Sequence, residues 1–365
     1  MNKSPNTKKS TKSKPMLVAG PCSAESADQL MSTAMQLKEL NIVDYFRAGV
    51  WKPRTRPGGF EGAGEKGLEW LKAIKEETGL KTAVEVATPA HIEKCLEYGI
   101  DMLWIGARTS VNPFSVDEIA RSLKGIDIPV LIKNPVNPDV DLWAGVIERI
   151  INAGIKQIYA VHRGFYTFEK KQYRNAPLWE IPIELKRRMP ELQILCDPSH
   201  IAGNRKLIPE ICQHAIDLDM NGFMIESHCN PQKALTDAKQ QLSPSALGEM
   251  WNKLEFKLAQ TKKAGHKQQF ESLREKIDYI DHEIIRMLAE RMDVVKEIGH
   301  LKKKQKITIL QIKRWRNIFK DRLKKGDELG LNKEFLQGLL ESLHQESIDI
   351  QTKLENEGDE SKKNT

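Results

Sequence analysis

The sequence predicts a (β/α)8 TIM barrel of the α/β class, followed by an all-α three-helix domain. The chain has 365 residues, and one hydrophobic core rarely serves more than about 250 to 300 residues, so two domains are expected. From residue 16 to about residue 240, short apolar, β-branched runs alternate with segments of helical period. Beyond residue 266 only the helical period remains.

Eight strand candidates support the barrel. They are residues 16–20, 45–50, 82–87, 102–107, 129–133, 157–162, 193–196 and 222–225, and a plausible helix follows each of them. Eight such units match a barrel better than an open doubly wound sheet, which usually has fewer strands and a glycine-rich phosphate loop after the first strand. Here the first turn reads AGPCSAES and contains no G-x-G-x-x-G.

The helical domain is predicted from apolar residues at spacings of three and four, which indicate one long amphipathic helix. These residues are Leu273, Ile277, Ile280, Ile284, Leu288, Met292, Val295 and Ile298. Two further helices are expected at about 310–325 and 332–356, with a turn at 326–330. Three helices with one long arm bury little surface, so this domain is expected to dimerise or to pack on the barrel.

The predicted domain bounds follow from these patterns. They are a disordered basic tail at 1–15, the barrel at 16–243, its last helix and a linker at 244–266, the helical domain at 267–356 and a disordered tail at 357–365. Five lysines in the first fourteen residues supply most of the net charge of +7. The remainder is nearly balanced, so no nucleic-acid partner is expected.

Two further features of composition bound the function. No apolar run approaches the roughly 18 to 20 residues that a bilayer span needs, so no membrane partner is expected. The five cysteines are an odd number without a C-x-x-C pair. That pattern argues against a disulfide framework and a zinc ribbon, and it favours a reducing cytoplasm.

Polar residues lie within or just after the carboxyl-terminal ends of the predicted strands, where a (β/α)8 barrel places its active site. They are Cys22, Arg47, Lys52, Glu85, Arg108, Lys133, His162, Arg163, Asp197, His200, Glu226 and His228. A ring of basic groups around one barrel mouth is electrostatically costly when nothing is bound, because like charges repel in a low-dielectric cleft. The ring therefore indicates polyanionic ligands, of which phosphates are the first choice.

A thiol, an imidazole and two carboxylates among these strand ends and loops suit a divalent cation of borderline softness. The candidate ligands are Cys22, His200, Glu226 and Asp237. Spacing alone leaves other interpretations open. Cys22 would serve equally as a small buried hydrophobe, while His200 and Asp237 would serve as ordinary residues at the start of a helix.

The barrel segment resembles the 3-deoxy-D-arabino-heptulosonate 7-phosphate (DAHP) synthases. The resemblance rests on AGPCSAES, FRAGVWKPRT, IGART, LIKN, HRGF, CDPSH, IESH and ALTD, in that order. It implies a divalent metal ion, Mn²⁺ or similar, held by Cys22, His200, Glu226 and Asp237. It implies phosphoenolpyruvate bound by Arg47, Lys52, Arg108, Lys133 and Arg163, and erythrose 4-phosphate bound by Lys52, Pro53, Arg54 and Thr55. Lys52 would also act as the catalytic proton donor.

The alternative is a related family that uses arabinose 5-phosphate to make an octulosonate 8-phosphate. That family usually has an A-N-R-S type of loop where this chain has KPRT, and KPRT favours the four-carbon sugar. The residues before Met16 are too few for the regulatory domain that some DAHP synthases carry there. Regulation is therefore expected from elsewhere in the chain.

The helical domain is rich in positive charge, with twelve Lys or Arg and two acids from Lys296 to Lys325. A solvated face, or a basic module that binds nucleic acid or an acidic partner, would account for that run alone. However, LREKID, AERMDVVKEIG and ESIDIQ resemble the all-helical chorismate mutases. The resemblance implies that chorismate or prephenate is bound by Arg274, Arg291, Lys302, Arg314, Ser347 and Gln351. Of these, Arg274, Arg291 and Lys302 would be catalytic.

Two positions depart from the mutase pattern, because Gln311 and Trp315 stand where acids are usual. These departures leave open a pocket that only senses its ligand. The resemblance also implies a homodimer through the helical domain. Two activities of the shikimate pathway in one chain suggest that prephenate or chorismate inhibits the barrel by way of the helical domain.

Overall fold

The computed structural model describes residues 15–52, 58–168, 172–257 and 264–356. The predicted tails lie outside the described residues, apart from Pro15. The chain divides into two compact units, residues 1–259 and 260–365, and each is described by itself. None of the helices in the described parts of the chain is long and apolar enough to cross a membrane.

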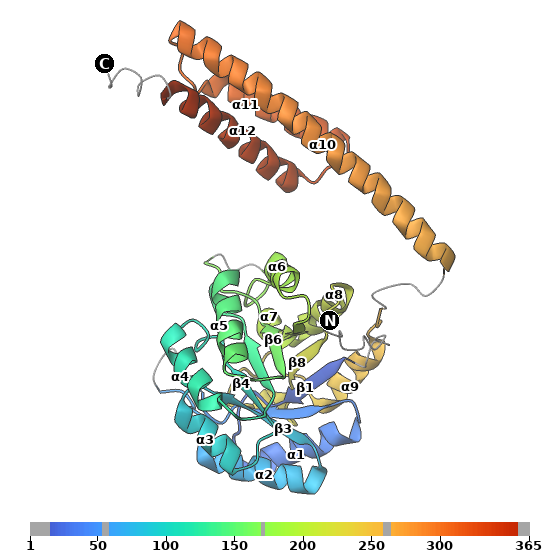
Figure 1. Cartoon of the computed structure of the whole chain (residues 1–365). Coiled ribbons are helices and arrows are strands. Elements are labelled where there is room, and N and C mark those ends of the chain that lie inside the picture. Colours follow the sequence, from blue (N-terminus) through green and yellow to red (C-terminus); the bar gives the residue numbers. More distant parts are fainter. Residues whose placement is uncertain (1–14, 53–57, 169–171, 258–263, 357–365) are drawn as a thin grey trace, which may run out of the picture. The chain divides into compact units, whose positions relative to one another are not determined.

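Eight parallel strands close into a barrel in sequence order, which confirms the predicted fold class (Figure 1). They are β1 (Met16–Gly20), β2 (Tyr45–Ala48), β3 (Lys81–Val86), β4 (Met102–Ile105), β5 (Val130–Lys133), β6 (Ile158–His162), β7 (Gln193–Cys196) and β8 (Gly222–Glu226). The barrel closes where β1 pairs with β8, from Met16 opposite Gly222 to Gly20 opposite Glu226. β2 and β4 each end two residues earlier than expected. The pairing of β2 with β3 stops at Ala48, so that Gly49 makes only an isolated bridge to Ser23, and a turn from Gly106 to Ser110 follows β4.

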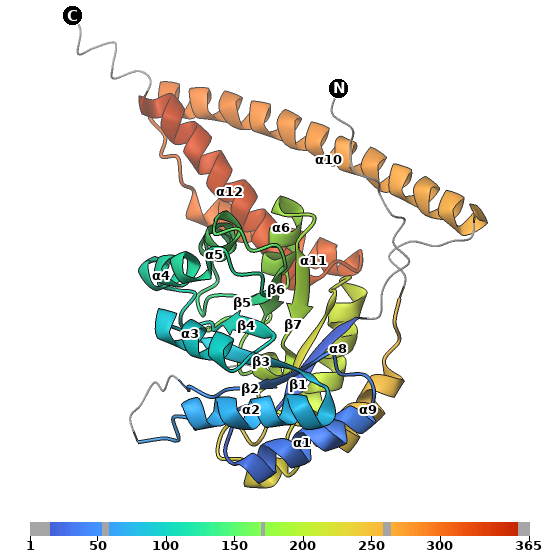
Figure 2. The same cartoon turned by 60° about the horizontal axis from the view of Figure 1, so that its bottom comes forward.

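Helices surround the barrel on its outside (Figures 1 and 2). They are α1 (Ala27–Glu39), α2 (Glu65–Thr78), α3 (Pro89–Glu97), α4 (Pro113–Leu123), α5 (Val140–Asn152), α6 (Glu180–Arg188), α7 (Pro198–Ala202), α8 (Ile208–Asp217) and α9 (Pro244–Lys253). Side-chain oxygens of Ser26, Thr88 and Asp139 accept the free backbone N–H groups at the starts of α1, α3 and α5. The start of each of these helices is therefore fixed by local sequence.

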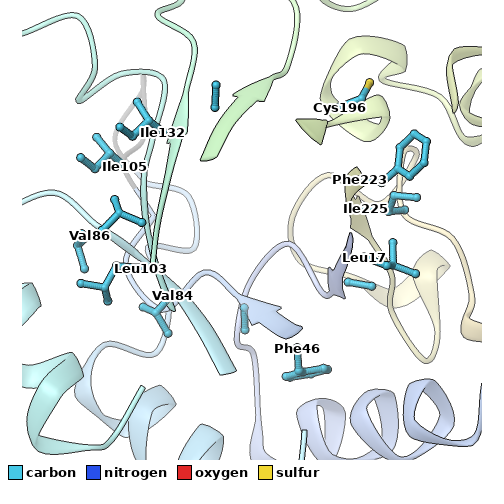
Figure 3. Packing of buried hydrophobic residues seen from close by; sticks show 14 of the residues in the cluster. Leu17, Phe46, Val84, Val86, Leu103, Ile105, Ile132, Cys196, Phe223 and Ile225 are labelled. Atoms are coloured by element: carbon cyan, nitrogen blue, oxygen red, sulfur yellow. The ribbon is translucent and has the colours of Figure 1, made fainter. Parts of the chain in front are cut away.

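Alternate residues of each strand point to opposite sides of the barrel wall. One set, including Leu17, Phe46, Val84, Ile105 and Phe223, packs outward against the helices (Figure 3). The other set fills the barrel interior with Val18, Ala83, Met102, Trp104, Leu131, Val161, Leu195 and Met224. The same alternation brings the side chains two residues further along β2, β5 and β8 to the inner face of the rim, and these are Arg47, Lys133 and Glu226.

The second unit consists of α10 (Ala264–Gln305), α11 (Ile312–Glu328) and α12 (Lys333–Asn356). α12 packs against both α10 and α11, and the first part of α10 extends beyond them in both views (Figures 1 and 2). The predicted turn at 326–330 begins later than expected, because Gly326 stays in α11 and packs against Leu336. The three-helix prediction is confirmed.

Candidate active site

Three of the four predicted metal ligands converge at the rim. Among the described residues, Cys22, Glu226 and Asp237 place one ligand atom each within 4.8 Å of one another. The sulfur of Cys22 lies 3.6 Å from Asp237 Oδ2. Asp237 has a positive φ of 48°, which is unusual for a residue with a side chain, so the loop after β8 holds it in a specific conformation.

His200 lies next to this trio. Its Nε2 lies 3.7 Å from Glu226 Oε1, and its Nδ1 lies 2.8 Å from Asp197 Oδ2. Asp197 begins α7 and accepts the backbone N–H of His200 at 3.0 Å, so one carboxylate fixes both the backbone and the ring. An imidazole whose second nitrogen faces a carboxylate is a common arrangement for a metal ligand.

The donor set fits a divalent cation. One thiol, one imidazole and two carboxylates suit Mn²⁺, Fe²⁺, Co²⁺ or Zn²⁺ better than they suit Ca²⁺ or Mg²⁺. Burial, followed by the nearby carboxylate of Glu226, raises the pKa of the Cys22 thiol to about 12. A protonated thiol is a poor ligand, so a cation bound here would displace the thiol proton.

Arg47 and Lys133 form buried ion pairs on the inner wall. Arg47 Nη1 lies 3.1 Å from Glu226 Oε1, and its guanidinium carbon lies 4.7 Å from the centre of the Trp104 ring. Lys133 Nζ lies 2.7 Å from Asp197 Oδ2. Burial would raise the pKa of Asp197, but His200 and Lys133 hold it well below its ordinary value. Fixed carboxylates therefore neutralise part of the predicted basic ring.

Lys52 reaches back from the loop after β2 to Cys22. Its ammonium group donates to the carbonyl oxygen of Cys22 at 3.1 Å and to the sulfur at 3.2 Å. Burial alone would lower the pKa of Lys52, but Cys22 and Glu85 raise it above its ordinary value. Lys52 is therefore charged at neutral pH.

Arg163 follows β6 and points to the same rim. Its Nη1 donates to Asn175 Oδ1 at 3.1 Å, and its backbone N–H donates to Asn134 Oδ1 at 2.7 Å. Burial lowers the pKa of the Arg163 guanidinium to about 10, and the neighbouring Arg174 and Arg108 contribute to the shift. Arg108 itself is exposed. These arginines form a positive region beside the carboxylates.

A cavity of about 290 Å³ lies beside Lys52 and is lined by Trp51, Lys52, Glu61, Glu85, Ala87 and His91. The rings of Trp51 and His91 stack at 3.9 Å and form one wall. Pro53, Arg54 and Thr55 of the KPRT segment lie outside the described residues. Their predicted role in binding a sugar phosphate therefore remains a prediction.

The helical unit gathers a second set of polar residues. Arg291 on α10 donates to Ser347 Oγ on α12 at 2.9 Å, and Gln351 lies one turn beyond Ser347. Ser347 and Gln351 are buried, and Gln351 Oε1 has no hydrogen-bond partner within the described residues. Burial and then Arg314 lower the pKa of Lys302. Five of the six predicted residues therefore share one region.

Arg274 does not join this region in the same chain. It is exposed and pairs with Glu271 at 2.6 Å. Both Arg274 and Arg291 belong to α10, and seventeen residues of helix separate them by about 25 Å along its axis. The resemblance groups Arg274 with the other five residues, but within one chain it lies apart from them, so its role in binding chorismate stays a prediction.

Several residues at these sites were not predicted. Arg174 and Gln240 lie in loops and contact Asp237, and His344 stacks on Trp315 at 3.7 Å. Arg174 and Gln240 lie in loops, which carry no periodic signal, so the sequence offered only their polarity as a sign of a role. His162, which the sequence placed among the rim residues, points outward instead and packs against the Trp179 ring at 5.0 Å.

Two family models match the chain. The model described as "DAHP synthetase I family" matches residues 3–261, and the model described as "Chorismate mutase type II" matches residues 273–352. The chain is 37% identical over 226 residues to a phospho-2-dehydro-3-deoxyheptonate aldolase of Thermotoga maritima, covering 62% of this chain and 64% of that protein. It is 25% identical over 253 residues to a 2-dehydro-3-deoxyphosphooctonate aldolase of Wolinella succinogenes, covering 64% and 95%.

Solved structures of DAHP synthases are also similar to the barrel of this chain. The crystal structure of the DAHP synthase of Thermotoga maritima superposes with a TM-score of 0.58 at 34% identity, covering 65% of this chain and 67% of that one. A truncated form of 3-deoxy-D-arabino-heptulosonate 7-phosphate synthase from the same organism gives 0.56 at 32% identity, covering 65% and 84%. The chain spans about two thirds of the Thermotoga protein in both comparisons.

Proposed function

Because the chain belongs to the DAHP synthetase I family, we propose that its barrel joins phosphoenolpyruvate to erythrose 4-phosphate and releases phosphate. We propose in addition that the helical unit rearranges chorismate to prephenate. Both reactions belong to aromatic biosynthesis. The five cysteines are free, which supports a reducing, cytoplasmic compartment for both.

The observation that carries the barrel proposal is one rim that holds both a cation-binding donor set and a cluster of basic side chains. Cys22, Glu226 and Asp237 supply the donors, with His200 beside them. Arg47, Lys52, Lys133 and Arg163 surround them, with Arg108 nearby. A phosphorylated carboxylate such as phosphoenolpyruvate needs that density of positive charge.

The basic side chains bind and orient phosphoenolpyruvate. The guanidinium groups of Arg108 and Arg163 would hold its phosphate, while Arg47 and Lys133, fixed by their buried carboxylates, would hold its carboxylate. Binding in one orientation places carbon three against the aldehyde carbon of the sugar phosphate, and good alignment of this kind can contribute ~7 to 11 kcal/mol. A divalent cation held by Cys22, His200, Glu226 and Asp237 would supply Lewis-acid polarisation of the aldehyde oxygen.

Lys52 is the proposed proton donor. The condensation forms the bond between carbon three and the aldehyde carbon, and the aldehyde oxygen takes up a proton. Water adds to carbon two, and phosphate leaves from the resulting hemiketal. The Lys52 ammonium group lies at the rim beside Cys22 and is charged, so it can deliver that proton and be recharged from solvent.

We propose erythrose 4-phosphate as the sugar substrate because of the chain's similarity to relatives, and a comparison of two sugar phosphates tests it. The chain is more similar to the Thermotoga deoxyheptonate aldolase than to the Wolinella phosphooctonate aldolase. We expect phosphate release from phosphoenolpyruvate with erythrose 4-phosphate and little with arabinose 5-phosphate. Faster release with the five-carbon sugar would instead support the octulosonate reaction.

For the helical unit, the proposal rests on Arg291, Lys302, Ser347 and Gln351 lying in one region. Positive groups there would hold the two carboxylates and the ether oxygen of chorismate, and a pericyclic rearrangement needs neither a metal nor a nucleophile. A basic module that binds nucleic acid remains the alternative. Circular dichroism that follows chorismate loss tests the enzyme, and a salt titration of nucleic-acid binding tests the alternative.

A homodimer would complete this region. The first part of α10 exposes a row of apolar side chains, including Leu273, Ile277, Ile280 and Ile284. A second copy of α10 lying antiparallel would cover this row and bring its Arg274 near Arg291 of the first copy. Ile280→Glu should therefore give monomers by sedimentation, whereas Lys276→Glu on the same helix should leave dimers. A wild-type chain that sediments as a monomer would contradict the proposal.

The helical unit is also the proposed feedback sensor. Prephenate bound by Arg291 and Lys302 would inhibit phosphate release by the barrel in the intact chain. Arg291→Met should then release phosphate at the wild-type rate and resist inhibition by prephenate. If prephenate never inhibits the wild-type chain, the sensor role is excluded, and the condensation itself is untouched by that result.

A further inference from the structure

We infer that Gln240 is a positioning residue of the proposed cation site, where its neutral amide ties the two carboxylate ligands together. The inference rests on the proposed function, because it concerns the cation that Cys22, Glu226 and Asp237 would hold. Gln240 lies in the loop between β8 and α9 and is 1% exposed. Its side chain touches both carboxylates of the trio.

The contacts of Gln240 are directional. Its amide nitrogen donates to Glu226 Oε2 at 2.7 Å and approaches Asp237 Oδ2 at 3.4 Å. Its amide oxygen accepts from Arg174 Nη1 at 2.6 Å. The same arginine nitrogen lies 3.0 Å from Asp237 Oδ1. Arg174, Gln240 and the two carboxylates thus form one closed network.

The chemistry of this network requires an amide. Arg174 can only donate, so it fixes the oxygen of the Gln240 amide on its own side and turns the NH₂ group toward the carboxylates. A carboxylate at residue 240 could not donate to Glu226 or Asp237. A lysine or arginine would donate but would add a positive charge that competes with the cation. The amide donates without bringing a full charge.

The network also sets which carboxylate oxygens face the other proposed ligands. Gln240 donates to Glu226 Oε2, whereas Glu226 Oε1 accepts from Arg47 Nη1 at 3.1 Å and lies 3.7 Å from His200 Nε2. Arg174 takes Asp237 Oδ1, while Oδ2 faces the sulfur of Cys22. One oxygen of each carboxylate therefore lies beside another proposed ligand, Glu226 Oε1 beside His200 and Asp237 Oδ2 beside Cys22.

The neighbouring Gln241 braces the same site from the backbone. It is fully buried, accepts the backbone N–H of Cys22 at 3.0 Å, and donates to the carbonyl oxygen of Thr236 at 2.8 Å. Thr236 directly precedes Asp237. The loop that carries the thiol and the loop that carries Asp237 are joined through this one side chain, so the surroundings of Gln240 are held rigid.

Cation binding without turnover provides the test. Titration of the intact chain with Co²⁺ should produce the near-ultraviolet absorption of a thiolate bound to cobalt, and competition with a chelator gives the dissociation constant. Gln240→Met keeps the volume but removes both donors, and it should weaken Co²⁺ binding by about 10- to 100-fold. Gln36→Met, on the exposed face of α1, is the control and should bind as the wild type does.

A second, more conservative variant keeps the test valid if Gln240→Met does not fold. Gln240→Asn keeps an amide in the buried space but is one methylene shorter, so it cannot reach both carboxylates and should also weaken binding. Folding of each variant is checked by thermal unfolding in cation-free buffer. If either folded variant binds Co²⁺ within twofold of the wild type, the role of Gln240 is overturned. If the wild type itself shows no thiolate absorption, the proposed cation site fails instead.

Coupling to Arg174 gives a further readout that a merely structural role would not produce. Because Arg174 orients the Gln240 amide, the combined loss of Co²⁺ affinity in Arg174→Met with Gln240→Met should be smaller than the product of the two single losses. Pairing Arg174→Met with Gln36→Met should give no such coupling. Multiplicative effects in the Arg174 and Gln240 pair would contradict the inference.

Discussion

The ammonium nitrogen of Lys52 lies 3.2 Å from the sulfur of Cys22, so the proposed proton donor and a proposed metal ligand are in direct contact. Lys52→Met removes the donor but leaves the thiol, and it should lower kcat for phosphate release by roughly 10²- to 10⁴-fold. Co²⁺ absorption should persist. Lys66→Met, on the exposed face of α2, is the control and should keep the wild-type kcat for phosphate release. An unchanged kcat would exclude Lys52 as the donor.

The buried pair of Arg47 and Glu226 predicts a large loss of stability when one partner is removed. Arg47→Met leaves the Glu226 carboxylate buried beside the other acids, and such a change typically costs about 3 to 5 kcal/mol. Arg187, which pairs with Glu184 on the exposed surface, is the matched control, and its replacement by Met should cost under about 1 kcal/mol. Urea unfolding followed by tryptophan fluorescence reports on the barrel, because every tryptophan except Trp315 belongs to it. An equal loss of unfolding free energy in Arg47→Met and Arg187→Met would contradict the stabilising role of the buried pair.

The outward position of His162 predicts a pH dependence of stability. Burial, with a contribution from Arg163, lowers the pKa of His162 to about 3. In the unfolded chain this histidine binds a proton near pH 6.5, whereas in the folded chain it stays neutral until about pH 3. The free energy of unfolding is therefore highest above pH 6.5 and falls as the pH drops toward 3. The slope from this group is about 1.4 kcal/mol per pH unit.

His162→Phe should remove that slope, provided the barrel still folds at neutral pH. His214→Phe is the control, because His214 contacts the same Trp179 ring from an exposed position on α8. Urea unfolding at pH 7, 6 and 5 gives the comparison. Parallel slopes for the wild type and His162→Phe would show that His162 already takes up its proton in the folded chain.

Replacing Arg291, which donates a hydrogen bond to Ser347, should affect only one of the two proposed activities. Arg291→Met removes a positive group from the helical region and should lower chorismate turnover by about 10²- to 10³-fold. Phosphate release by the barrel should not change in the absence of prephenate. Arg286→Met, which removes an exposed arginine paired with Glu283 on the same helix, should leave both activities intact. Equal turnover in the two variants would argue against a mutase site here.

The barrel itself could be predicted because its strands are short apolar runs separated by helices, and eight of them fit one architecture. β1 and β7 have the predicted bounds, since Gly20 and Asp197 mark their ends clearly. The apolar Val50 predicts a longer β2, but Gly49 makes only an isolated bridge to Ser23, a partner far away in the sequence that the local pattern does not reveal.

The site was predictable where strand alternation decides which way a side chain points, as for Arg47, Lys133 and Glu226. His162 shows the limit, since it ends β6 but takes the outward position, and only the register of the strand decides this. Gln240 and Arg174 could not be predicted, because the loops that carry them have no period. Arg274 and Arg291 cannot meet within one chain, because a shared helix face says nothing about the distance along the helix.

The proposed condensation depends on one cation held by Cys22, His200, Glu226 and Asp237. Phosphate release from phosphoenolpyruvate and erythrose 4-phosphate should stop when the intact chain is treated with a chelator and return when Mn²⁺ is added. Cys22→Ala should release little phosphate under either condition. Full activity after exhaustive chelation, or wild-type activity of Cys22→Ala, would show that the condensation needs no cation at these residues.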